Sequence, residues 1–180
     1  MASTIVFETH SLSEDNEHGI ASGWGDCGLS ARGRTLASEL GERRRNDAID
    51  TVFCSDLRRA RETAEIAFEG SRIPILFDWR LRECDYGLFN GQLGAVLHRD
   101  RQQYLNQVYP DGESWQQAVA RVERFIQDID LRWKGKRILV IGHVATKWAF
   151  DQKLNDVPLE TSLEQDFDWH EGWVYSWSGQ

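Results

Sequence analysis

Two histidines far apart in the chain each follow a short run of bulky apolar residues. His10 comes after Ile5, Val6 and Phe7, and His143 ends the run RILVIGH. Runs of this kind predict strands that are buried on both faces of a sheet. Ligands of an open α/β sheet bind outside the carboxyl ends of such strands, so both imidazoles are expected where chemistry takes place. One histidine in this position is usually structural, whereas two of them indicate a site.

An arginine and a carboxylate complete this set of reactive side chains. Arg58 and Arg59 lie where a second predicted strand meets a helix, and the free N–H groups of a helix start favour an anion. Glu83 and Asp85 are candidate acids in a glycine-containing loop. Arginine binds phosphate through two-pronged hydrogen bonds, and a neutral imidazole can take up a phosphoryl group while a carboxylic acid protonates the departing alcohol. His10, Arg59, Glu83 and His143 together predict phosphoryl transfer.

The sequence lacks the signatures of several other phosphate chemistries. It has no Walker-type glycine-rich loop, no paired aspartates for a metal cage, and no histidine spacing typical of a zinc site. None of Cys27, Cys54 and Cys84 is followed six positions later by arginine, which argues against a cysteine phosphatase. Three dispersed cysteines also indicate a reducing compartment rather than a disulfide framework. We expect neither a metal nor another cofactor.

Composition limits the partners of the chain. With 180 residues, 41% of them hydrophobic, we expect one domain spanning residues 1–180. The formal net charge of −8 argues against nucleic-acid binding, and the basic cluster at residues 43–45 is expected to be the solvated end of a helix. No basic leader precedes an apolar segment, and no apolar run approaches the ~20 residues that a bilayer requires. We therefore expect a cytoplasmic protein that binds no membrane.

The predicted elements alternate between strands and helices. Strands are expected at residues 5–7, 50–55, 73–77, 138–142 and 172–177, the last at a sheet edge. Helices are expected at residues 30–44, 56–68 with Asp56 as N-cap, 92–107, 114–133, 145–153 and 157–165. Residues 11–28 form a long loop of the kind that is commonly functional. This order predicts a three-layer α/β sandwich, in which a mostly parallel sheet carries helices on both faces.

Six motifs in order resemble the histidine phosphatase superfamily, also called the phosphoglycerate mutase-like family. They cover nearly the whole chain: THS with Asn16 behind it, GWGDCGLSARG, SDLRRARETA, LRECDYGLFNG, DGES and VIGHVATKW. Each motif is weak alone, but together they are specific. The resemblance implies a phosphoglycerate mutase-like fold and a reaction without metal.

The resemblance also assigns roles to individual residues. It implies that His10 is the nucleophile, kept neutral and oriented through its other ring nitrogen, and that Glu83 is the general acid. Arg59, rather than its neighbour, falls on the phosphate-binding arginine because it directly precedes alanine. His143 falls on the second histidine of the family. Two further positions fall on phosphate contacts: the side chain of Asn16 and the backbone N–H of Val144, where the family usually has glycine.

The chain departs from the family at the triplet that holds the nucleophile. Where the family has Arg-His-Gly, this chain has Thr9-His10-Ser11, so one guanidinium is missing from the phosphate pocket. A hydrogen bond to a charged group contributes about 1.5–3 kcal/mol, or about one to two decades in affinity or rate. Thr9 can still offer a hydroxyl group. Three cations could replace the lost charge: Lys147, Arg58 and Arg82. Lys147 is ranked first because it lies one helical turn from His143.

We therefore expect a metal-independent phosphomonoester hydrolase that forms phosphohistidine on His10 and uses Glu83 as general acid. Its partner is a small-molecule phosphate ester, and a homodimer is left open. One alternative is phosphoglycerate mutase-type transfer. Leu12 argues against it, because family mutases tend to carry glutamate at that position. The length of the chain also argues against it, because it leaves little room for the insertions that would close the site against water. The other is a catalytically weakened phospho-ligand binding module, for which Thr9 is the main argument. A ring-bearing leaving group would suit three aromatic residues, although core packing explains them equally well: Trp24, Tyr86 and Phe89.

Overall fold

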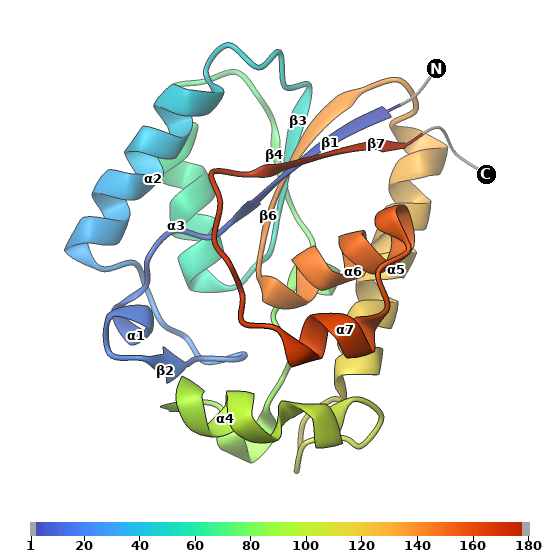
Figure 1. Cartoon of the computed structure of the whole chain (residues 1–180). Coiled ribbons are helices and arrows are strands. Elements are labelled where there is room, and N and C mark those ends of the chain that lie inside the picture. The colour runs from blue at the N-terminus through green and yellow to red at the C-terminus, as the bar shows by residue number, and fades with distance from the viewer. Residues whose placement is uncertain (1–2, 178–180) are drawn as a thin grey trace.

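Residues 3–177, which the computed structural model describes, form a central sheet with helices packed on both of its faces (Figure 1). The strand order is β4-β3-β6-β1-β7. The strands are β1 (Ser3–Thr9), β3 (Thr51–Cys54), β4 (Ile75–Phe77), β6 (Arg137–Gly142) and β7 (Trp173–Trp177). Neighbours pair in parallel except β1 and β7, which pair antiparallel at the edge. The predicted mostly parallel α/β architecture is confirmed, as is the edge position of the last strand.

Two hydrophobic cores lie on opposite faces of the sheet. Figure 1 shows α2 (Ala31–Arg44) and α3 (Arg58–Ala67) on one side, and α5 (Trp115–Arg132), α6 (Val144–Asn155) and α7 (Leu159–Glu164) on the other. Successive strand residues point to opposite faces. Ile5 and Phe7 of β1 accordingly join the core under α5 and α6, and Val6 joins the core under α2 and α3. The apolar run before His10 is thus a central strand buried on both faces.

The segment expected to be one helix over residues 92–107 is divided in the structure. It begins with β5 (Gln92–Leu93), which pairs antiparallel with β2 (Ile20–Ala21), continues as α4 (Gly94–Asp100) and ends in a 3-10 helix (Arg101–Tyr104). The guanidinium of Arg101 is buried and donates to the carbonyl of Leu163 at 2.6 Å. Pairing with distant segments therefore overrides the weak helical pattern of this stretch.

The structure differs from two local expectations, one about a loop and one about a helix N-cap. The loop expected over residues 11–28 contains β2 and a short helix α1 (Glu14–Glu17). Asp56 does not cap α3, whose N-cap is Leu57 without a side-chain hydrogen bond. The Asp56 carboxylate instead accepts two hydrogen bonds from Arg82, both of 2.7 Å. The ion pair with Arg82 therefore holds the Asp56 side chain, which the local sequence predicted to cap α3.

The basic cluster at residues 43–45 is not simply a solvated helix end. Glu8 of β1 is buried, with 1% of its surface exposed, and Arg43 and Arg44 both reach it from the last turn of α2. Arg44 also donates to the carbonyl of Glu171 at 2.9 Å. A buried carboxylate requires such partners, because an unpaired charge in the interior is very costly. The cluster therefore ties β1 to α2 and to the segment before β7.

No helix among residues 3–177 is both long and apolar enough to cross a bilayer.

Candidate active site

His10 directly follows β1, and its ring is oriented by the backbone. Nδ1 lies 2.6 Å from the carbonyl oxygen of Ser11. A carbonyl only accepts, so Nδ1 carries the proton and Nε2 keeps a free lone pair. Burial and the cation of Arg59 lower the pKa of His10 to about 3, which keeps the ring neutral above that pH. His10 thus has the protonation state of a nucleophile.

The residue that orients His10 is itself held firmly. The N–H of Ser11 donates to the hydroxyl of Thr63 at 2.9 Å, and its own hydroxyl donates to the carbonyl of Gly33 at 2.7 Å. Gly33 lies so close to this loop that a Cβ there would come within 1.9 Å of the carbonyl oxygen of Leu12. A serine is therefore accommodated at the third position of the triplet because its side chain turns toward α2.

Arg59 lies in the first turn of α3 and is 2% exposed. Its Nε is 3.3 Å from Nε2 of His10, and its Nη2 is 3.4 Å from Nδ1 of His143. The carbonyls of Gly23 and Gly25 accept further hydrogen bonds from it at 2.8 and 3.4 Å. The guanidinium therefore faces both imidazoles, and the two ring centroids are 4.9 Å apart.

His143 is the N-cap of α6 and is buried. Its Nδ1 accepts from Nη2 of Arg59, which can only donate, and its backbone N–H donates to the hydroxyl of Thr146 at 3.2 Å. The proton of the neutral ring is therefore on Nε2, which lies 2.9 Å from the hydroxyl oxygen of Ser55. Burial and Arg59 lower the pKa of His143 well below its ordinary value. Ser55 was missed from the sequence, although it stands where the strand DTVFCS ends.

Glu83 lies in the same site with only 9% of its surface exposed. Its carboxylate accepts the N–H groups of Cys84, Ala145 and Val144 at 2.8, 3.1 and 3.3 Å. The last two begin α6, so the positive end of this helix faces the carboxylate. Burial raises the pKa of Glu83 above its ordinary value and outweighs the opposite effect of these N–H groups and of Arg59. The N–H of Val144, expected to meet phosphate, is donated to Glu83 in this structure.

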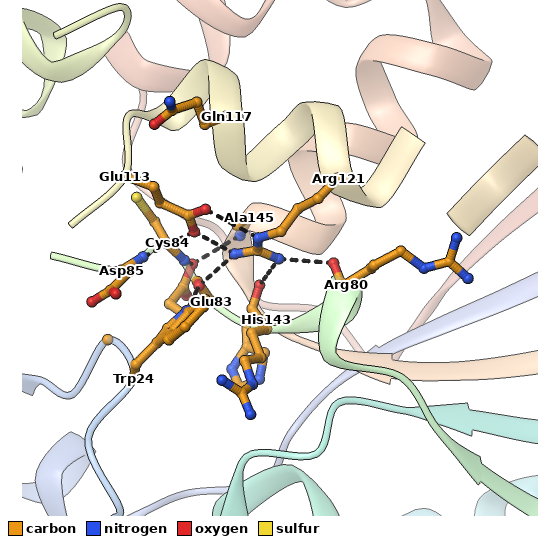
Figure 2. Close-up of polar contacts among 12 residues, drawn as sticks. Trp24, Arg80, Glu83, Cys84, Asp85, Glu113, Gln117, Arg121, His143 and Ala145 are labelled. Atoms are coloured by element: carbon orange, nitrogen blue, oxygen red, sulfur yellow. Dashed lines mark hydrogen bonds and ion pairs between the residues drawn. The ribbon is translucent and has the colours of Figure 1, made fainter. Parts of the chain in front are cut away.

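A buried arginine lies behind Glu83 and was missed from the sequence. Figure 2 shows Arg121 of α5 between the backbone of the Glu83 loop and the carboxylate of Glu113. The hydrophobic spacing of this helix predicts a core helix. Such a pattern gives no sign that one of the buried residues is charged. Glu113 belongs to the DGES motif, but nothing in that motif identifies its partner.

The remaining predicted phosphate contacts have other partners. The hydroxyl of Thr9 accepts from Nε1 of Trp169 at 3.1 Å, and this tryptophan is 56% exposed between α7 and β7. The amide oxygen of Asn16 accepts from the N–H of Ser13 at 3.1 Å, closing a capping box around α1. Among the contacts of residues 3–177, none joins Asn16 to His10.

Each of the three cations considered as substitutes for the missing arginine is paired with a carboxylate. Arg58 pairs with Glu62 at 2.9 Å, and Arg82 pairs with Asp56. Lys147, ranked first from the sequence, pairs with Asp151, and its ammonium lies 5.0 Å from the ring centroid of Trp173. Because all three cations are paired alike, the ranking of Lys147 first stays a prediction.

The aromatic residues noted in the sequence divide into core and site. Tyr86 is 6% exposed and packs edge-on against Tyr109, and Phe89 packs against the same core. Trp24 is half-buried, and its Nε1 donates to the backbone carbonyl of Glu83 at 2.7 Å. Trp24 therefore makes a hydrogen bond to a residue of the site.

The structure thus combines a mostly parallel sheet with two neutral histidines, an arginine and a buried glutamate gathered at one site. Such a set of groups can bind and transfer a phosphoryl group. The chain belongs to the histidine phosphatase superfamily, branch 1, whose family model matches residues 5–173.

Known proteins similar to this chain include both phosphatases and mutases. The probable phosphoglycerate mutase GpmB of Citrobacter koseri is 32% identical over 147 residues, which cover 77% of this chain and 68% of that protein. The adenosylcobalamin/alpha-ribazole phosphatase of Salmonella typhimurium is 32% identical over 142 residues, which cover 74% of this chain and 70% of that protein. The structure of Bacillus stearothermophilus YhfR matches with a TM-score of 0.83 at 26% identity, covering 96% of this chain and 90% of that chain.

Proposed function

We propose that this chain is a metal-independent phosphomonoester hydrolase that acts on a small-molecule phosphate ester through phosphohistidine on His10. The observation that carries the proposal is the state of His10. The backbone holds the proton on Nδ1, so that the lone pair of Nε2 faces the buried guanidinium of Arg59. A phosphoryl group placed beside that guanidinium lies in front of the nucleophile.

In the first step, Nε2 of His10 attacks phosphorus and the bond from phosphorus to the ester oxygen breaks. Glu83 gives its proton to that oxygen, which leaves as an alcohol. Arg59 exchanges its long hydrogen bonds with the imidazoles for stronger ones to the negative phosphoryl oxygens. In the tautomer that carries the proton on Nδ1, His143 can donate a hydrogen bond to the same oxygens, and its Nε2 accepts from the hydroxyl of Ser55.

In the second step, water attacks phosphorus and the bond from phosphorus to Nε2 breaks. The Glu83 carboxylate takes the proton of the attacking water, and inorganic phosphate leaves. Glu83 is then protonated and His10 neutral, as at the start. No step requires a metal, because the guanidinium of Arg59 supplies the positive charge and the neutral ring of His143 supplies a hydrogen bond.

A mutase is the second candidate, since relatives 32% identical to this chain are named probable phosphoglycerate mutases. A mutase returns the phosphoryl group to a substrate hydroxyl instead of to water. Leu12 offers no polar group to hold such an acceptor, which favours hydrolysis.

One assay separates these functions. The protein is incubated in EDTA with an aryl phosphate and with 3-phosphoglycerate, and both inorganic phosphate and 2-phosphoglycerate are measured. We expect release of phosphate that disappears in His10→Gln. Formation of 2-phosphoglycerate without net release identifies a mutase. Protection against thermal unfolding by phosphate without any turnover identifies a binding module.

A further inference from the structure

We propose that Arg121 is a positioning residue for the general acid, and that it acts by holding the backbone of the loop that carries Glu83. Arg121 lies on α5 and is 4% exposed. The inference rests on the proposed role of Glu83 as proton donor. It adds a residue that would not touch the substrate and would nevertheless control where the proton is delivered.

The guanidinium of Arg121 has a partner for each of its five N–H groups. Nη1 donates to the carbonyls of Arg80 and Arg82 at 2.8 and 2.7 Å. Nη2 donates to the carbonyl of Glu83 at 2.7 Å and to Oε1 of Glu113 at 2.5 Å, and Nε donates to Oε2 of Glu113 at 3.2 Å. Five donors in a rigid planar fork meet five acceptors, an arrangement that the three donors of lysine cannot reproduce.

Three of these five acceptors are the backbone carbonyls of Arg80, Arg82 and Glu83. Figure 2 labels the first and the last of them beside Arg121. Glu113 also fixes the backbone after Glu83, because its Oε1 accepts the N–H of Asp85 at 3.1 Å. The carbonyl of Glu83 takes a second hydrogen bond from Trp24. The main chain is thus held before, at and after Glu83.

Stability alone is a weak reason for a charge at this position. The neighbours of Arg121 on α5, Val119 and Val122, are fully buried in the core. Burial of an ion pair often stabilises a protein no more than apolar residues of the same volume would. Placement of a catalytic group is different, since an error of about 1 Å can cost about a hundredfold in rate. The five hydrogen bonds of Arg121, called the clamp below, fix the backbone of the Glu83 loop in the way that such placement requires.

The test compares Arg121→Lys with a matched control, Arg101→Lys. Arg101 is also buried and also donates to two backbone carbonyls, those of Leu163 and Gln165, but the structure gives it no contact with the Glu83 loop among residues 3–177. For both variants, kcat/KM is measured with an alkyl phosphate, whose leaving group needs a proton, and with a nitrophenyl phosphate, whose leaving group does not. Circular dichroism and thermal unfolding report the integrity of the fold.

We expect Arg121→Lys to lower kcat/KM for the alkyl ester by about 10- to 100-fold, because complete loss of general acid catalysis costs about 10²–10⁴-fold. The nitrophenyl ester should lose less than about threefold. Arg101→Lys should change both substrates by the same factor. Equal losses with Arg121→Lys would overturn the positioning role and leave the hydrolase intact, whereas absence of turnover in the unmodified protein would overturn both.

A second variant keeps the test decisive if Arg121→Lys does not fold. Glu113→Gln retains the shape and one acceptor of the clamp while it removes the charge that fixes the guanidinium. We expect the same selective loss for the alkyl ester, smaller in size. Unchanged selectivity in a folded Glu113→Gln protein would contradict the proposal.

Discussion

The two sides of the site are built differently. On the phosphate side, formed by His10, Arg59 and His143, the guanidinium reaches the two imidazoles at 3.3 and 3.4 Å. On the acid side, formed by Glu83, Arg121 and Glu113, the guanidinium reaches the Glu83 carbonyl at 2.7 Å and Glu113 at 2.5 Å. The contacts of Arg59 with the imidazoles are long, whereas four of the five contacts of Arg121 are no longer than 2.8 Å and each of its N–H groups has a partner.

This difference matches what each side would do in the proposed reaction. A phosphoryl group must replace the contacts between Arg59 and the histidines, so these contacts should be weak. The proton of Glu83 must be delivered to one oxygen, so the loop that carries it should be fixed before substrate arrives. The resemblance to the family predicts that the phosphate side lacks a cation at Thr9, and we expect this to lower the affinity for phosphate without misplacing any group.

Removal of the acid itself should have the largest effect among the variants of this comparison. Glu83→Gln keeps one oxygen for the N–H groups of Cys84 and Ala145 but has no acidic proton. We expect kcat/KM for an alkyl phosphate to fall by about 10²–10⁴-fold, and much less for a nitrophenyl phosphate. Asp85→Asn is the neighbouring control and should keep most of the activity. Equal losses for both esters would show that Glu83 does not donate the proton.

The pH profile should distinguish the two sides next. His10 is neutral above about pH 3 because its pKa is lowered to about 3, so it imposes no acid limb near neutrality. Glu83 must be protonated in the first step, and its pKa is raised by burial, so kcat/KM should fall as pH rises through that pKa. The fall approaches tenfold per pH unit.

The titrating group is identified by comparison with Glu83→Gln, which should lack this alkaline limb. An arginine side chain is not deprotonated in this range, so Arg59 contributes no limb. An alkaline limb that persists unchanged in Glu83→Gln would assign the titration to the substrate or to another residue.

A smaller effect is expected from Ser55 on the phosphate side. Ser55→Ala leaves the buried Nε2 of His143 without its partner, and an unsatisfied buried group costs about 1–3 kcal/mol. We expect the free energy of unfolding to fall by about that amount and kcat/KM to fall by about tenfold for both esters alike. Urea unfolding and steady-state kinetics measure these two changes. Selective loss for the alkyl ester would place Ser55 on the acid side instead.

The smallest expected change is a gain. Thr9→Arg restores the guanidinium of the family triplet, but Trp169 occupies the hydroxyl of Thr9 and must move. We expect phosphate to inhibit about three- to tenfold more tightly, less than the full value of a charged hydrogen bond. The double variant Thr9→Arg with Trp169→Ala should gain more than Thr9→Arg alone. If phosphate inhibited the double variant more weakly than it inhibits the unmodified protein, residue 9 would not face the bound phosphate.

The sequence was sufficient to find the fold and the residues that lie at the ends of elements. His10, Arg59 and His143 each stand where a strand or its following helix begins or stops, so hydrophobic periodicity locates them without knowledge of distant contacts. The same reasoning yields the parallel sheet, because buried strands and intervening helices allow few other arrangements.

The supporting residues could not be found in this way. Arg121 lies 38 positions from Glu83, and Trp169 lies 160 positions from Thr9. Their roles depend on which segments pack together, which the local pattern of α5 or of the segment before β7 does not contain. The division of residues 92–107 has the same cause, since β5 exists only because β2 lies beside it.

The central claim is that the phosphoryl group passes through Nε2 of His10. It is tested by mixing the protein with an aryl phosphate in EDTA, quenching within the first turnovers in alkali, and locating the added phosphoryl group by peptide mass spectrometry. We predict a phosphoryl group on His10 that is stable in alkali, is lost in acid and is missing in His10→Gln. Turnover with no phosphoryl group on His10, or with one on another residue, would contradict the account.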